Sequence, residues 1–175
     1  MSAAEFRIRP AEKADIDAVR ALLRETWHQV YDPILGPDAV EEISTRWHAA
    51  ALLAGQLLMP RSSFLVACQH DRLVGHGFAY MREPATLVVS RLYVRPYHQR
   101  QSIGRRLLAA LRARHPEAAI VRLFVAAENP RGVSFWHGQG FIVVGQGMEE
   151  GARVLHMELA AASGLPSAPP PGWPA

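Results

Sequence analysis

Residues 92–108 most constrain what this chain can fold into, because their pattern predicts a strand, a turn and the start of a helix. The stretch from Thr86 to Val94 is rich in β-branched and apolar residues, which is typical of a buried strand. Pro96 ends this strand, since proline cannot donate a hydrogen bond to the ladder. The helix is predicted by apolar residues at helical spacing: Ile103, Leu107, Leu108 and Leu111. The first N–H groups of a helix lack partners and lie at the positive end of its dipole, so this turn is a natural anion site.

The charge around this turn favours a phosphorylated ligand. From Pro84 to Pro116 the sequence has no Asp or Glu but seven Arg. The turn lacks the Gly-x-x-x-x-Gly-Lys-Ser/Thr of a P-loop and the full Gly-x-Gly-x-x-Gly of a dinucleotide fold. Judged by spacing alone, it fits a phosphate cradle or an ordinary strand-to-helix turn equally well.

The bulk composition bounds the remaining possibilities. A length of 175 residues indicates one domain with a sizeable core. The net charge is only +3 and Lys13 is the sole lysine, so nucleic acid is not an expected partner. The single cysteine, Cys68, excludes an intrachain disulfide and a cysteine-based metal cluster, and we expect no metal. The start of the chain lacks the pattern of a signal peptide and no apolar run would span a bilayer, so we expect a cytoplasmic protein without a membrane partner.

Along the chain, patterns of period 2 and period 3.6 alternate in an order that predicts a mixed α/β domain. Strands are expected at Phe6–Pro10, Phe64–Cys68, Leu73–Met81, Thr86–Val94, Ile120–Ala126, Phe141–Gly145 and Val154–Leu159. Helices are expected from Asp15 to a break after Tyr31, from about Asp38 to Leu57 either unbroken or with an interruption, from Ile103, and at Pro130–Gln139. Residues 1–160 would form the single domain. Residues 161–175 are rich in Pro, Ala, Ser and Gly and are predicted to be a flexible tail.

Two motifs resemble the signatures of the GNAT N-acetyltransferase superfamily. The first is Leu92-Tyr93-Val94-Arg95-Pro96 followed by Gln99-x-x-Ser102-x-Gly104, with serine where the middle glycine is usual. The second carries Asn129, Gly132, Phe135, Gly140 and Phe141 in the order of the second block of that family. The resemblance covers about Phe6 to Leu159. It implies a GNAT fold: a mixed central sheet of about seven strands with helices on both faces and splayed central strands.

The resemblance also implies acetyl-CoA as the cofactor. In that family the chain bulges, here near Tyr93, and acyl-CoA enters the wedge between the two splayed strands. Main-chain groups of Leu92 and Val94 would pair with the pantetheine arm. Asn129 would contact the same arm, or simply cap the helix that follows it. The implied cofactor-binding residues are Leu92, Tyr93, Val94, Gln99, Arg100, Gln101, Ser102, Ile103, Gly104, Arg105, Asn129, Arg131, Phe135 and Trp136.

The chemistry implied is direct attack of an amine on the thioester, without a covalent enzyme intermediate. The N–H of Val94 would hold the oxyanion. The two side chains that commonly move protons in the family are absent, because Val88 replaces a glutamate and Trp136 replaces a tyrosine. Water, Ser134 or His137 would then protonate the thiolate. Candidate bases are Glu128, His76 and His98.

The acceptor side of such a fold is formed by the first two helices, where Trp27, His28 and Tyr31 are candidates, with His76 beside them. An aromatic pair near an acid, here Asp32, suits an amine. The alternative is that Trp27 is a core residue and Tyr31 a surface one. The expected substrate is an amine of a small molecule or peptide, and a homodimer is possible. Rival interpretations are a non-catalytic acyl-CoA-binding sensor or interaction module, and a nucleotide-binding protein.

Overall fold

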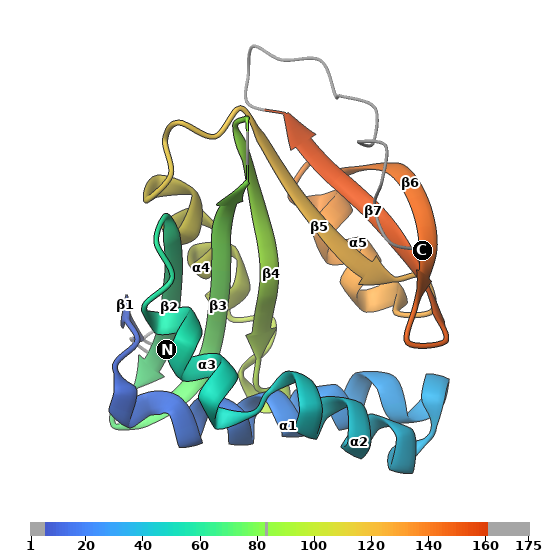
Figure 1. The fold of residues 1–175 in the computed structure, drawn as a ribbon, viewed down its shortest axis with the longest axis horizontal. Coiled ribbons are helices and arrows are strands. Elements are labelled where there is room, and N and C mark those ends of the chain that lie inside the picture. The colour runs from blue at the N-terminus through green and yellow to red at the C-terminus, as the bar shows by residue number, and fades with distance from the viewer. Residues whose placement is uncertain (1–5, 83, 161–175) are drawn as a thin grey trace.

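A seven-stranded sheet of order β1-β2-β3-β4-β5-β7-β6 runs through the protein in the computed structural model, which describes residues 6–82 and 84–160 (Figure 1). All neighbours are antiparallel except β4 and β5. The fold is therefore the mixed α/β sheet that the sequence predicted. The strands are β1 (Arg7–Pro10), β2 (Ser62–Gln69), β3 (Arg72–Arg82), β4 (Thr86–Val94), β5 (Ile120–Ala126), β6 (Ile142–Glu149) and β7 (Ala152–Ala160).

Helices cover both faces of this sheet. The bounds are α1 (Ile16–Leu35), α2 (Pro37–Trp47), α3 (Ala50–Leu57), α4 (Ile103–Ala113) and α5 (Pro130–Gly138), with short 3-10 turns at Lys13–Asp15 and Pro96–His98. Buried residues of α1 and α3 pack on Phe64, Val66 and Phe78 on one face. Helices α4 and α5 share the core on the other face. None of the helices in the described ranges is both long and apolar enough to cross a bilayer.

Two glycines of β3 let α4 approach the sheet closely. A Cβ at Gly75 would lie 3.1 Å from side-chain atoms of Ile103 and Leu107, and one at Gly77 would lie 3.0 Å from Leu111. These distances are too short for unshifted side chains. Glycines within a strand often allow such a close approach, and this one brings the start of α4 next to the end of β4.

Strands β4 and β5 separate after a short parallel contact. Only three residue pairs join them, ending at Val88 and Arg122. Beyond that point the edge of β5 that faces β4 is unpaired, while the other edge of β5 pairs with β7 along its whole length (Figure 1). A bulge in β4 sits at Ser90, because Val89 and Arg91 face consecutive residues of β3. The expected position near Tyr93 is therefore wrong by three residues.

Two helix boundaries differ from the predicted ones. Helix α1 continues through Pro33 to Leu35, since a proline in the last turn removes only one hydrogen bond, and Gly36 with a φ of +84° ends it. The helix expected from about Asp38 to Leu57 begins at Pro37 and has the interruption that was considered, at residues 48–49, where the carbonyl of His48 accepts from Nε of Arg20. The predicted tail at residues 161–175 lies outside the described residues and stays a prediction.

Candidate active site

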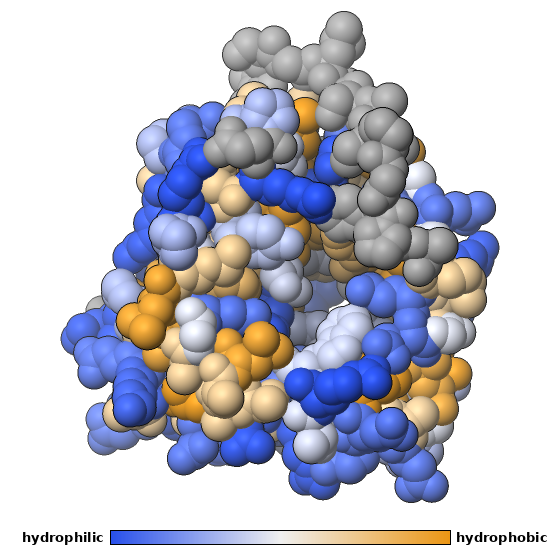
Figure 2. Space-filling model, viewed as in Figure 1, coloured by the Kyte–Doolittle hydropathy of each residue, from blue (hydrophilic) through white to orange (hydrophobic). Residues whose placement is uncertain are grey.

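A cleft of about 1260 Å³ opens where β4 and β5 diverge. The end of β4, the start of α4, β5, α5 and the second half of α1 all contribute to its walls. Figure 2 shows the molecule hollowed between the part that carries α1 to α3 and the part that carries β6 and β7. Every residue predicted to bind cofactor lines this cleft except Gln101, whose exposed side chain donates to the carbonyl of Tyr97.

The main chain of β4 turns unpaired N–H groups toward the cleft. The N–H of Arg95 donates to the Val74 carbonyl on β3, at 2.9 Å. Since successive N–H groups of a strand point to opposite edges, those of Val94 and Leu92 face the side where β5 has moved away. The Val94 carbonyl accepts from Nε2 of Gln99 at 3.1 Å. The strand thus offers a free edge, and Gln99 fixes the turn that follows it.

The start of α4 forms a second set of donors at the same cleft. Ser102 is the residue before the helix, and the first intrahelical bond runs from the N–H of Arg106 to its carbonyl, at 3.0 Å. The N–H groups of Ile103, Gly104 and Arg105 therefore have no helical acceptor. Together with the helix dipole and the nearby arginines, they suit a phosphorylated ligand.

Ser102 adopts a left-handed backbone with a φ of +63°, where the resembled signature has glycine. Such a conformation costs a residue with a Cβ roughly 1–2 kcal/mol. Its hydroxyl makes one long contact, 3.4 Å to Nη2 of Arg105. We expect Ser102→Gly to raise the free energy of unfolding by about 1 kcal/mol in denaturant titrations, net of the freedom that glycine adds to the unfolded chain. Ser102→Ala, which keeps the Cβ, is the control, and equal stability of the two variants would contradict this explanation.

Asn129 caps α5 beside the cleft. Its Oδ1 accepts from the N–H of Gly132 at 3.0 Å, and Pro130 occupies the first helical position. A Cβ on Gly132 would lie 2.6 Å from Nδ2 of Asn129, so only glycine leaves this amide in place. The capping role that the sequence indicated is confirmed. The Nδ2 group of Asn129 takes no part in this cap and stays a predicted ligand donor.

The two roles of Asn129 separate experimentally. Asn129→Asp and the neutral Asn129→Ser both keep an oxygen that caps, so we expect their unfolding free energy to stay within about 0.5 kcal/mol of wild type. Both remove the amide donor, and we expect coenzyme A affinity measured by calorimetry to fall about tenfold. Unchanged affinity in both variants would reduce Asn129 to a cap.

A family model described as an acetyltransferase (GNAT) domain matches residues 31–161, most of the chain. The chain belongs to the GNAT family. Solved structures share this fold: PaiA N-acetyltransferase of Thermoplasma acidophilum in complex with coenzyme A is 22% identical, with a TM-score of 0.80, covering 90% of this chain and 99% of its own. The structure of yncA from Salmonella typhimurium with its cofactor acetyl-CoA is 21% identical, with a TM-score of 0.63, covering 94% and 99%. The ribosomal-protein-S18-alanine N-acetyltransferase of Escherichia coli is 18% identical, with a TM-score of 0.68, covering 93% and 100%. A search of curated proteins finds no match.

Three candidate proton-transfer groups of this GNAT domain line the cleft, and two do not. Glu128 and Ser134 lie along it, with Oε1 of Glu128 3.4 Å from Nε of Arg153. His98 also lines it, and its Nδ1 is buried without a hydrogen bond. Burial, helped by nearby arginine charges, lowers the pKa of His98. His137 is a correction: it lies outside the lining, with Nδ1 bonded to the Phe141 carbonyl at 3.1 Å.

His76 is a second correction. It is fully buried in the middle of the sheet, stacked 4.5 Å from Phe64, with Nδ1 bonded to the Leu65 carbonyl at 3.0 Å. It does not line the cleft. Burial and the charge of Arg91 lower the pKa of His76 to about 3. A neutral core histidine without access to the cleft serves neither as a base nor as a substrate contact.

The end of the cleft beside α1, which is predicted to hold the acceptor, is aromatic. Tyr31 lines it, while Trp27 is 7% exposed and donates from Nε1 to the Tyr93 hydroxyl at 3.0 Å. The core reading of Trp27 is thus the one the structure shows. Burial raises the pKa of Tyr31, and the nearby Tyr93 and Glu149 raise it further. Neutral tyrosines line this end near neutral pH.

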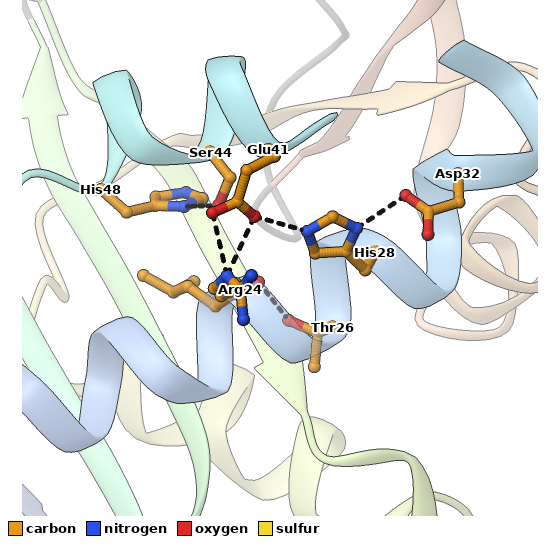
Figure 3. A network of polar contacts seen from close by, with 8 residues as sticks. Arg24, Thr26, His28, Asp32, Glu41, Ser44 and His48 are labelled. Atoms are coloured by element: carbon orange, nitrogen blue, oxygen red, sulfur yellow. Dashed lines mark hydrogen bonds and ion pairs between the residues drawn. The ribbon is translucent and has the colours of Figure 1, made fainter. Parts of the chain in front are cut away.

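His28 lies outside the cleft and joins α1 to α2, which is a third correction (Figure 3). Its Nδ1 is 2.8 Å from Oδ1 of Asp32, and its Nε2 is 2.8 Å from Oε2 of Glu41. Arg24 pairs with the same Glu41 (Figure 3). Both nitrogens of His28 are occupied, so a substrate amine has no free ring atom to meet.

The contacts of His28 with Asp32 and Glu41 should make the thermal stability of the protein depend on pH. Glu41 raises the pKa of His28 above its ordinary 6.5, Asp32 adds to the rise, and burial opposes it. Because the pKa of His28 is higher in the folded protein than in the unfolded chain, its ion pairs stabilise the fold most below pH 6.5. This stabilisation is lost as pH rises through the folded pKa. We expect Tm of wild type minus that of His28→Gln to be constant below pH 6.5 and to fall by about 1–2 °C above it. A Tm difference that does not change with pH would show that the charge of His28 does not stabilise the contact between α1 and α2.

Sequence reasoning missed two charged residues at this end of the cleft. Arg91 lines the cleft on the same face of β4 as Tyr93 and is 8% exposed. Glu149 lies at the end of β6 and acts electrostatically on both Tyr31 and Tyr93. Partial burial and the adjacent Glu150 raise the pKa of Glu149. An arginine in a buried strand, two residues before the tyrosine of the signature, was the available signal for Arg91.

Proposed function

We propose that this GNAT domain transfers an acetyl group from acetyl-CoA to a primary amine of a small molecule or peptide. The observation that carries the proposal is the cleft between β4 and β5, where a free strand edge and the unpaired start of α4 lie together. The relatives solved with coenzyme A and with acetyl-CoA share the fold, which makes this cofactor the natural occupant.

The residues present fit coenzyme A. A pantetheine arm carries amides that pair with a strand edge such as that of Leu92 and Val94. The diphosphate needs several N–H donors and positive charge, which the turn and α4 supply through Gly104, Arg100 and Arg105. Phe135 lies across from Gly104 and would bound the ligand on the α5 side.

In this reaction the protein positions the two substrates and stabilises the developing charge, and it forms no covalent bond with either substrate. The amine nitrogen forms a bond to the acetyl carbonyl carbon, the carbon–sulfur bond breaks, the amine loses a proton and the thiolate gains one. The Val94 N–H, aimed into the cleft, is placed to stabilise the oxyanion. Among the side chains, Glu128, His98 and Ser134 are the cleft-lining groups for proton movement.

A thiol-release assay tests the proposal. The protein is incubated with acetyl-CoA and a panel of amines that spans amino acids, polyamines, aminoglycosides and peptides, while calorimetry measures coenzyme A binding in parallel. We expect binding together with turnover of at least one amine class. Binding without turnover of any amine would favour the non-catalytic acyl-CoA module, and absence of binding would overturn the cofactor assignment.

A further inference from the structure

Arg91 is a buried cation in the wall of the acceptor end of the cleft. It follows the bulge at Ser90 and lies opposite Phe78 of β3, with its guanidinium 5.6 Å from that ring. The residue is 8% exposed and lines the cleft together with Tyr31 and Tyr93. Burying a charge is costly unless a partner compensates it.

The protein itself supplies little compensation for this charge. Nη1 donates to Oε1 of Gln56 on α3 at 2.5 Å, one bond from a group with five N–H donors. Across residues 6–82 and 84–160, no carboxylate forms an ion pair with Arg91. Burial lowers the pKa of Arg91, as expected for a cation without a nearby anion.

The acidic groups around this end of the cleft are engaged elsewhere. Glu25 of α1 pairs with Arg95, and Glu150 pairs with Arg46 of α2. Asp32 and Glu41 hold His28. Glu149 alone acts on the same tyrosine as Arg91, because its charge raises the pKa of Tyr93 while that of Arg91 lowers it. The acceptor end thus carries a positive group in its wall and a negative group near its rim.

We propose that the acceptor is an amine that also carries a carboxylate, and that Arg91 binds this carboxylate. The inference rests on the proposed acetyl transfer and names its substrate class. A guanidinium pairs with a carboxylate through two parallel N–H bonds, and the donors left free by Gln56 are available for this. The bound anion would compensate the buried charge, while Glu149 at the rim favours the approach of the cationic amine.

The experiment determines the distance between the amine and the carboxylate of the acceptor, because α- and ω-amino acids both carry these two groups. Arg91 precedes Val94 by three residues, about 10 Å along an extended strand. The flexible arginine side chain spans part of that distance. The panel therefore contains L-amino acids and ω-amino acids such as β-alanine and γ-aminobutyrate, each next to its carboxamide, which differs only in lacking the negative charge.

Steady-state kinetics with acetyl-CoA compare each acid with its amide. We expect kcat/KM of the best acid to exceed that of its amide by about tenfold or more. Arg91→Gln should abolish this preference by raising KM of the acid to about that of the amide, and Arg91→Lys should keep part of the preference. Arg112→Gln, which changes an exposed arginine of α4, is the control and should behave as wild type. Equal use of acids and amides by the wild type, or a preference that survives Arg91→Gln, would overturn the proposal.

A binding experiment keeps the inference testable if no amine is acetylated. N-acetyl amino acids are the products of the proposed reaction. Calorimetry in the presence of coenzyme A compares the binding of these acids with that of their amides. Carboxylate-dependent binding that Arg91→Gln removes would support the anion site even though the transferase proposal had failed. Equal binding of acids and amides, or no binding of either, would overturn the anion site while leaving the coenzyme A result to decide the proposed function.

Discussion

Replacing Gly104 with valine should abolish coenzyme A binding while the domain stays folded. A Cβ at this position would point toward the cleft, 3.4 Å from Cζ of Phe135 and 3.8 Å from Cγ2 of Val94. The two further methyl groups of valine would occupy the space above the unpaired N–H groups of α4, where the diphosphate is assigned. We expect the dissociation constant from calorimetry to rise at least about a hundredfold, which corresponds to roughly 2.7 kcal/mol.

Gly104→Ala is the matched control for this experiment. Its single Cβ lies at ordinary van der Waals distance from Phe135, so we expect affinity within about threefold of wild type. Circular dichroism and thermal melting of both variants check that the fold is retained. Wild-type affinity in Gly104→Val would show that the phosphates bind elsewhere.

Removing Arg122 alone should give the largest loss of stability among the substitutions considered. Arg122 on β5 is 7% exposed and donates from Nε, at 2.7 Å, and from Nη2 to Oε1 of Glu158 on β7, which is 1% exposed. Oε2 of Glu158 has no hydrogen-bond partner. In Arg122→Met a buried carboxylate would remain without its cation, and we expect a loss of about 3–5 kcal/mol in denaturant titrations. Tm should fall by roughly 6–20 °C.

The double variant Arg122→Met with Glu158→Leu separates the missing partner from lost packing. Two apolar side chains of similar volume leave no charge unpaired, so we expect the double variant to regain most of the lost free energy. A double variant as unstable as the single one would show that packing, and not the stranded carboxylate, sets the cost. Because the pair joins β5 to β7, coenzyme A affinity of the refolded double variant also reports whether this half of the cleft keeps its shape.

The fold was predictable because most of its helices and strands have local sequence patterns that identify them. The strands around Thr86–Val94 and Ile120–Ala126 are short apolar runs between breakers, and the structure gives both the predicted bounds. An interruption between Asp38 and Leu57 was considered, but its place at His48 was not predictable from periodicity, because Arg20 and Trp27 of α1 contact His48 only in the folded protein. The end of α1 was predicted too early, after Tyr31, because a proline such as Pro33 is tolerated in the last turn of a helix.

The part of the site that is built from main chain was the most predictable. A strand, a turn and a helix start specify where N–H groups point, whatever side chains accompany them. Two side-chain assignments failed because they depended on packing between distant elements: His28 contacts Glu41 of the next helix, and His76 packs against Phe64 in the core. Arg91 was overlooked because an arginine in a buried strand has no local signature of its partner.

The brief contact between β4 and β5 has a consequence for how this protein can evolve. A ligand gripped by peptide groups at a strand edge does not sense which apolar side chains that strand carries, so most positions along it are free to drift. Selection then acts on a few positions where a larger side chain would fill the cleft, such as Gly104, or displace a helix cap, such as Gly132. Divergence to roughly one identical residue in five, with the architecture intact, is what such a design permits.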